Sequence, residues 1–123
     1  MFELKVTTRF AAAHRLTMVG KQCENLHGHN WHVEVYVQGE NLDKGGVLMD
    51  FGIVKKELKK VIDTLDHTYL NESEIFKDVP ASSEHIAMYI AKELERRIDV
   101  DGIKVSRVSA WESENSCATY IAD

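Results

Sequence analysis

The stretch CENLHGHNWHVEVYVQ, residues 23–38, decides how the rest of this chain is interpreted. From residue 31 onward it alternates apolar and polar residues, which predicts a half-buried strand at 31–38. Side chains alternate across an extended segment, so His27 and His29 are expected to point to the same side. Gly28 between them leaves room for a metal or a substrate to approach the backbone closely.

A metal site is the interpretation favoured when a third histidine, His14, is added to this pair. Three neutral nitrogen donors and an open fourth position are what catalytic zinc prefers. Cys23, four residues before His27, supplies a thiol that can act as a nucleophile or proton acceptor if its pKa is lowered. The alternative is a pair of solvated histidines beside a small buried thiol.

The remaining sequence predicts an alternation of strands and helices. Strands are predicted from period-two patterns at 2–10, 31–38, 103–112 and 117–122. Residues 11–30 are interpreted as a long irregular connection. Apolar residues at helical spacing predict one helix at about 51–65 with Asp50 as its N-cap, and a second ending at about 98 that is capped by Ser82 or Ser83. A slip in alternation between Val105 and Val108 predicts a bulge.

The order ββααββ indicates an α+β fold: a four-stranded antiparallel sheet with both helices on one face. Such a sheet leaves its other face and its two edge strands open. Pairing between subunits is one way to cover an open edge, so the pattern also favours oligomerisation.

Composition limits the class of protein. A chain of 123 residues with 44% apolar and 28% charged residues predicts a single soluble domain over residues 1–123. We expect a cytoplasmic protein without a membrane partner, because no bilayer-length apolar run and no signal-peptide pattern is present. A net charge of −5 argues against a general nucleic-acid partner. In that compartment Cys23 and Cys117 are expected to stay reduced, and Cys117 is interpreted as structural.

Two further motifs carry groups that can do chemistry. Asp66-His67 offers a carboxylate that can fix the tautomer of an imidazole, although a histidine is also favourable at a helix end for structural reasons alone. Glu112 is an acid inside a predicted strand, where acids are disfavoured. It could accept hydrogen bonds from the paired N–H groups of a heterocycle, or simply face solvent.

Taken together, these residues resemble the 6-pyruvoyltetrahydropterin and 6-carboxytetrahydropterin synthase family. The resemblance spans nearly the whole chain and rests on ordered motifs at matching spacing, namely Phe10-x-Ala-Ala-His14, Cys23-x3-His27-Gly-His29, Met49-Asp-Phe51, Leu65-Asp-His67-x2-Leu70-Asn71, Ser83-Glu84 and Glu112.

The resemblance implies roles for these residues. Zinc would be held by three histidines, His14, His27 and His29. Protons would be moved by Cys23, Asp66 and His67. Glu112 would anchor the amino-pyrimidine edge of a pterin. The implied tunnelling fold assembles into trimers whose sheets close a barrel, and trimers usually pair into hexamers with active sites between subunits.

The spacing Cys-x3-His-Gly-His is similar to the bacterial 6-carboxytetrahydropterin branch, because pyruvoyl enzymes of animals carry a longer gap. That branch converts 7,8-dihydroneopterin triphosphate to 6-carboxytetrahydropterin, acetaldehyde and triphosphate on the way to 7-deazaguanines such as queuosine. The triphosphate needs cations, and Arg9, Arg15 and Lys21 flank the motif in sequence.

Two positions depart from the family pattern. Family members often carry Pro-Thr-Ser-Glu where this chain has Ala81-Ser-Ser-Glu84, which retains a hydroxyl at Ser82. Glu24 creates a second motif, Glu-x2-His-Gly-His, and in some relatives a glutamate so placed replaces the cysteine. Those enzymes make the folate precursor 6-hydroxymethyl-7,8-dihydropterin, so Glu24 is a candidate substrate-contacting residue for a second or alternative activity.

Overall fold

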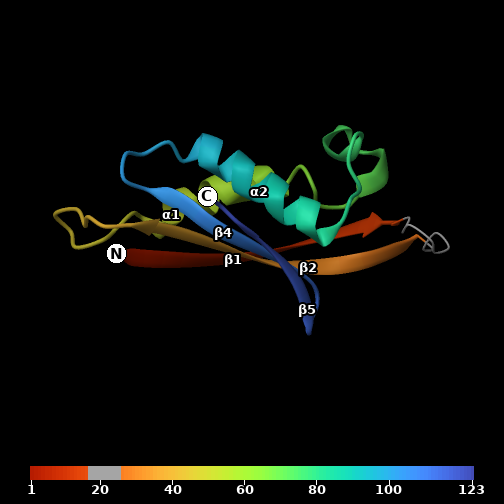
Figure 1. The fold of residues 1–123 in the computed structure, drawn as a ribbon, viewed down its shortest axis with the longest axis horizontal. Coiled ribbons are helices and arrows are strands. Elements are labelled where there is room, and N and C mark those ends of the chain that lie inside the picture. The colour runs from red at the N-terminus through yellow and green to blue at the C-terminus, as the bar shows by residue number, and fades with distance from the viewer. Residues whose placement is uncertain (17–25) are drawn as a thin grey trace.

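The computed structural model describes residues 1–16 and 26–123. Its long strands are β1 (Phe2–His14), β2 (His27–Gly39), β4 (Lys104–Ser113) and β5 (Ser116–Ile121), and β3 is the two-residue segment Thr68–Tyr69. The helices are α1 (Phe51–Ile62), α2 (Ser83–Arg97) and two 3₁₀ turns, η1 (Leu70–Glu72) and η2 (Glu74–Phe76). The strands form one sheet in the order β3-β1-β2-β4-β5, and α1 and α2 lie together on one face of it (Figure 1).

The core lies between the sheet and the two helices. Along β2, the odd-numbered residues from Trp31 to Val37 are buried, whereas the even-numbered residues between them are partly exposed. Val54 and Leu58 of α1 and Ile90 of α2 close the core from the helix side. The predicted α+β architecture with both helices on one face is therefore confirmed.

The sheet has five strands and not the predicted four. β3 runs parallel to β1, and its residues pair with Ala12 and Ala13. Alternation cannot reveal a strand of two residues, because a period of two needs at least several residues to be recognised. β3 covers the outer edge of β1 only near the end where β1 stops. Among the described residues, the rest of that edge is open.

The interpretation of 11–30 as an irregular connection is wrong at both ends. β1 continues to His14 and β2 begins at His27, and these two residues pair directly. The alanines of β1 and Gly28 of β2 have low intrinsic strand preference. Cross-strand hydrogen bonding outweighs that preference, because a backbone group left unpaired in the interior is costly.

The helix ends follow local chemistry. The Asp50 side chain accepts a hydrogen bond from the backbone N–H of Gly52 at 2.8 Å, so the predicted N-cap of α1 is confirmed. Ser82 is the N-cap of α2 and accepts from the backbone N–H of His85 at 3.2 Å. α1 ends at Ile62 and not at about 65, and a turn follows in which the Thr64 hydroxyl donates to the Val61 carbonyl at 2.6 Å.

The predicted bulge in β4 is confirmed. The pairing with β2 passes from Tyr36–Arg107 to Val37–Val105, so Ser106 is the extra residue. The bulge lets Val105 and Val108 both face the core although three positions separate them. Neither α1 nor α2, nor any other helix of the described segments, has the length and apolarity of a membrane span.

The face of the sheet away from the helices, called here the open face, is polar and internally paired. Lys5 Nζ lies 2.6 Å from Glu34 Oε2, and the Trp111 indole N–H donates to Glu34 Oε1 at 2.6 Å. The hydrogen bond from Lys5 holds the pKa of Glu34 below its ordinary value. This face therefore carries ordered charges in place of an apolar layer.

The Asp50 cap gives a stability prediction. Asp50→Ala should lower the free energy of unfolding by about 1 kcal/mol, because the N–H of Gly52 loses its side-chain acceptor. Urea denaturation followed by circular dichroism measures the change. Asp50→Ser keeps a short acceptor and should remain close to wild type. Equal losses in both variants would show that the cap does not stabilise α1.

Candidate metal centre

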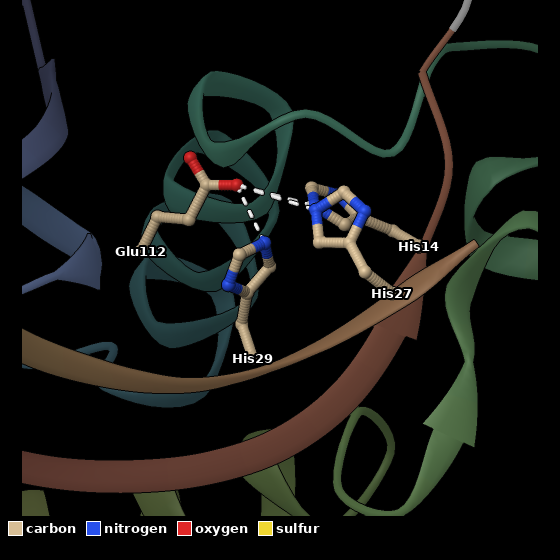
Figure 2. Close-up of side chains that lie close together, drawn as sticks. All are labelled: His14, His27, His29 and Glu112. Carbon is tan, nitrogen blue, oxygen red and sulfur yellow. Dashed lines mark ion pairs between the residues drawn. The ribbon is translucent and has the colours of Figure 1, made fainter. Parts of the chain in front are cut away.

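Three imidazoles gather at the end of the β1–β2 pair. His14 pairs with His27 across the two strands, and His29 follows two residues later on the same face of β2. Their ring centroids lie between 4.3 and 5.1 Å apart, and the angles between the ring planes run from 68° to 90°. Figure 2 shows the three side chains converging on the helix side of the sheet, with α2 behind them. The antiparallel register thus brings together the three histidines that the sequence singles out.

The ring of His14 is oriented by a hydrogen bond that leaves one nitrogen available. Its Nδ1 lies 2.7 Å from the carbonyl oxygen of Ala81, and a carbonyl can only accept, so Nδ1 carries the proton. The neutral ring then presents a lone pair at Nε2, which is buried and accepts no hydrogen bond from the described residues. A ligand histidine held by a backbone carbonyl through its other nitrogen is the usual arrangement at metal sites.

Trp31 forms the floor of this group. Its ring centroid lies 4.9 Å from that of His14 and 5.1 Å from that of His29, in edge-on contacts. The indole N–H donates to the Ser83 hydroxyl at the start of α2, at 3.3 Å. Because Trp31 is fully buried, it limits the space into which the two imidazoles can turn.

Glu112 of β4 completes the cluster. Its Oε1 lies 2.8 Å from His29 Nε2, 3.3 Å from His14 Nε2 and 4.0 Å from His27 Nε2. One donor atom from each of these four residues lies within 4.8 Å of the other three (Figure 2). Nitrogen donors from imidazole together with a carboxylate oxygen suit a divalent transition metal such as zinc. The donor set and the oriented, buried Nε2 of His14 therefore fit a metal ion.

A cavity of about 330 Å³ adjoins the cluster, and Glu112 belongs to both. Its lining combines the β4–β5 pair, the start of α2 and the end of β1, with Leu16, Ser82, Ser83, Glu84, Glu112, Ser116, Cys117 and Ala118. Hydroxyl groups and two carboxylates, Glu84 and Glu112, in a hollow of this size can fix a small polar heterocycle. Ser116 and Cys117 were not among the expected site residues, because only the pairing of β5 with β4 brings them there.

Asp66 and His67 lie beside each other, next to the end of β1. Asp66 Oδ1 accepts from the backbone N–H of Ala11 at 2.9 Å, and Oδ2 lies 3.5 Å from His67 Nε2. The His67 side chain is 82% exposed. It shares a hollow with Gly28 and Asn30, positions that face away from the helices, and with His29 of the cluster. No described hydrogen bond or ion pair links Asp66 or His67 to the histidine cluster.

The backbone of His67 has an unusual conformation. Its φ of +57° is the one positive value among the described non-glycine residues. A left-handed conformation costs roughly 1 kcal/mol or more for a residue with a Cβ. It is held in place because the His67 N–H donates to the Ala11 carbonyl at 2.6 Å and Asp66 is fixed to the same residue. Such a locally unfavourable geometry directs the imidazole outward.

The other predicted residues divide into two groups. Cys23, Glu24 and Lys21 lie outside the described residues. Arg9 projects from the open face, where it lines a groove of about 500 Å³ with Glu34 and Trp111. Arg15 is exposed just beyond β1, where its backbone exchanges hydrogen bonds with the Asn71 side chain. Of the three cations expected near a triphosphate, Arg9 therefore lies on the opposite face of the sheet from the cluster of its own chain.

Known proteins are similar to this one in architecture and in sequence. Residues 3–123 match the family described as 6-pyruvoyl tetrahydropterin synthase. The chain belongs to that family. Its fold is therefore the tunnelling fold, and its relatives process pterins. A solved 6-pyruvoyl tetrahydropterin synthase from Caenorhabditis elegans superposes with a TM-score of 0.87 at 27% identity, covering 99% of this chain and 96% of that one.

Two curated relatives differ in activity. A 6-carboxy-5,6,7,8-tetrahydropterin synthase from Synechocystis is 36% identical over 118 residues, covering 92% of this chain and 88% of the relative. A dihydroneopterin monophosphate aldolase from Pyrococcus furiosus is 38% identical over 103 residues, covering 84% and 82%. Family membership therefore establishes a pterin-processing fold, while the reaction has to be argued from the site.

Metal content tests the cluster. We expect the purified protein to hold about one divalent transition-metal ion per chain, as measured by plasma mass spectrometry. His27→Ala should lose most of this metal and keep its circular dichroism, because β1 and β2 pair through their backbones. His32→Ala is the matched control, since His32 lies on the same strand but on the open face. Full metal content in His27→Ala would show that the ligand assignment is wrong.

Proposed function

We propose that this protein is a zinc-dependent 6-carboxy-5,6,7,8-tetrahydropterin synthase that converts 7,8-dihydroneopterin triphosphate to 6-carboxytetrahydropterin, acetaldehyde and triphosphate. The product would enter the synthesis of 7-deazaguanines such as queuosine. The observation that carries the proposal is the cluster of His14, His27, His29 and Glu112 beside a cavity of heterocycle size, in a chain of this family.

Zinc is the proposed ion, held by His14, His27 and His29. When bound, zinc supplies Lewis acidity that polarises hydroxyl groups on the substrate side chain and favours loss of a neighbouring proton. The chain contributes the orientation of the ligands: the Ala81 carbonyl holds the His14 ring, and Trp31 restricts the rings of His14 and His29.

Glu112 is proposed to anchor the pterin. A carboxylate can accept two parallel hydrogen bonds from the amino group and ring N–H of an amino-pyrimidine edge. Glu112 is the carboxylate common to the cavity and the cluster among the described residues, so it can hold the ring while the side chain of the substrate extends toward the histidines. Ser82 and Ser83 add hydroxyl partners on the α2 side of the cavity.

Protons are proposed to move through Cys23 and the Asp66–His67 pair. Cys23 comes four residues before His27, which keeps its thiol within a short chain length of the cluster. Asp66 can orient the His67 ring and stabilise its charged form. The His67 ring is exposed and makes no described hydrogen bond or ion pair with the cluster of its own chain, so we propose that it serves the metal site of a neighbouring subunit.

A homo-oligomer would bring these groups together. The outer edge of β5 pairs with no described strand, and the outer edge of β1 pairs only at Ala12 and Ala13. Edge-to-edge pairing of subunits would satisfy these backbone groups and close the sheets into a barrel. The same contact would carry His67 of one chain to the cluster of the next. We propose a trimer or a pair of trimers on this basis.

A second candidate reaction is aldol cleavage of the substrate side chain to 6-hydroxymethyl-7,8-dihydropterin, either alone or beside the main reaction. Two observations favour it: Glu24 adjoins Cys23, and the aldolase of Pyrococcus furiosus is 38% identical to this chain. Formation of 6-pyruvoyltetrahydropterin is a weaker alternative, because the gap between Cys23 and His27 is shorter than in the animal enzymes.

Product analysis separates these reactions. Wild type, Cys23→Ala and Glu24→Ala would be incubated with dihydroneopterin triphosphate and their products identified by mass. We expect 6-carboxytetrahydropterin from wild type and Glu24→Ala, and a loss of at least about 100-fold in turnover for Cys23→Ala, since a proton-transfer group is removed. Hydroxymethyl-dihydropterin that persists in Cys23→Ala and disappears in Glu24→Ala would establish the aldolase instead.

Subunit complementation tests the shared site. His27→Ala damages the metal half and His67→Ala the proton-transfer half, so each variant alone should be inactive. Co-expressed in equal amounts, they should regain about a quarter of wild-type turnover, because random assembly pairs two intact halves at that frequency. Co-expression of His27→Ala with His14→Ala is the control, because both damage the same half. Absence of recovery in the first pair would place the whole site within one chain.

A further inference from the structure

The position of Glu112 suggests a role beyond anchoring the ring. We infer that the Glu112 carboxylate is the fourth metal ligand of the resting enzyme and leaves the metal when it takes hold of the pterin. The inference rests on the proposed function only in taking the three histidines as metal ligands. Under this inference, binding of the heterocycle by Glu112 would itself open a coordination position on the metal.

The distances place Glu112 at a vertex of the cluster. In a tetrahedral site with metal–ligand distances of about 2.1 Å, the donor atoms lie about 3.4 Å from one another. The three separations from Glu112 Oε1 to the imidazole Nε2 atoms are 2.8, 3.3 and 4.0 Å, which bracket that value. An oxygen that occupied the centre of the site would lie much closer to all three nitrogens. Oε1 therefore lies where a fourth ligand belongs.

Charge favours the same assignment. Three neutral imidazoles leave both positive charges of a divalent ion uncompensated, and His14 is fully buried beside Trp31. A charge in such surroundings is costly unless an opposite charge accompanies it. Glu112 is the acidic group that lies within the cluster among the residues described. Its carboxylate would compensate half of the charge of the ion.

The ligand is exchangeable because of where the side chain lies. The Glu112 side chain is 34% exposed, in contrast to the buried ring of His14, and it also lines the adjoining cavity. In Figure 2 one carboxylate oxygen points toward the imidazoles and the other away from them. Accepting two parallel hydrogen bonds from an amino-pyrimidine edge uses both oxygens. Binding of the ring would therefore draw Oε1 from the metal and open that position for a substrate hydroxyl.

This arrangement would couple specificity to activation. A compound without the amino-pyrimidine edge has no donors to draw the carboxylate away, so the fourth position stays closed to it. While Glu112 holds the fourth position, water would not occupy that position. Four protein ligands alone would be typical of a structural metal site. The cavity beside Glu112 is the feature that distinguishes the proposed site from a structural one.

Zinc affinity gives the first test. A chromophoric chelator would compete for zinc with wild type, Glu112→Gln and Glu114→Gln, with circular dichroism used to verify folding. Glu112→Gln should weaken zinc binding by about 10- to 100-fold, as changes close to a metal do. Glu114, on the neighbouring β4–β5 turn and outside the cluster, is the matched control and should change nothing. If Glu112→Gln does not fold, Glu112→Asp keeps the charge on a shorter stem and should show a smaller loss.

Cobalt absorption gives the second test. Co²⁺-loaded wild type should show a visible spectrum of four-coordinate cobalt that changes when unsubstituted pterin is added. Co²⁺-loaded Glu112→Gln should start with a different spectrum and respond little. A loss of zinc affinity without any response of the wild-type spectrum to bound pterin would make Glu112 a permanent ligand and overturn the exchange.

The outcomes also separate this inference from the proposed function. Wild-type zinc affinity and spectrum in Glu112→Gln, combined with lost pterin binding, would overturn the inference and leave Glu112 as an anchor only. Retention of zinc in His27→Ala would overturn the metal centre itself, and with it the proposed function.

Discussion

The pairing of His14 with His27 at the ends of β1 and β2 is the contact on which the site depends. In an antiparallel pair a shift of one residue moves every side chain to the other face. Such a shift would carry His27 and His29 to the open face and leave His14 alone under the helices. The buried residues Phe10, Trp31 and Val33 hold the register, because a shift would expose each of them at a cost of about 1.5–3 kcal/mol.

The cluster lies at the margin of the core, so one side of it is buried and the other side adjoins a cavity. On its inner side His14 is buried, bound to the Ala81 carbonyl and packed against Trp31. On its outer side Glu112 reaches a cavity that opens toward α2 and β5. The inner side supplies rigidity, which a metal site needs to keep its ligands in place. The outer side supplies access, which a substrate needs.

The two faces of the sheet divide the chemistry. The cluster and its cavity lie on the helix side, whereas the exposed His67 ring shares a hollow with the open-face positions Gly28 and Asn30 and with His29. A sheet is a barrier that side chains cannot cross, so groups on its two faces can cooperate only around an edge or between subunits. The open edges of β1 and β5 are consistent with the second route.

Much of this protein could be predicted from its residues alone. Alternation in 2–10 and 31–38, the helical spacing after Asp50 and the slip between Val105 and Val108 all reflect periodicities that secondary structure imposes directly. His27 and His29 could be grouped because they lie on the same side of an extended segment. His14 could be added as a third histidine that ends the family motif Phe10-x-Ala-Ala-His14. These features are local, and local geometry is visible in sequence.

Only the tertiary structure decided the rest. Strand β3 and the extension of β1 and β2 to His14 and His27 depend on backbone pairing, which no side-chain pattern records. The position of Glu112 among the imidazoles depends on the neighbouring β4, far away in sequence. The exposed position of His67 beside the end of β1 depends on the pairing of β3 with that strand. Each of these is a relation between segments distant in the chain, and sequence periodicity carries no information about such distances.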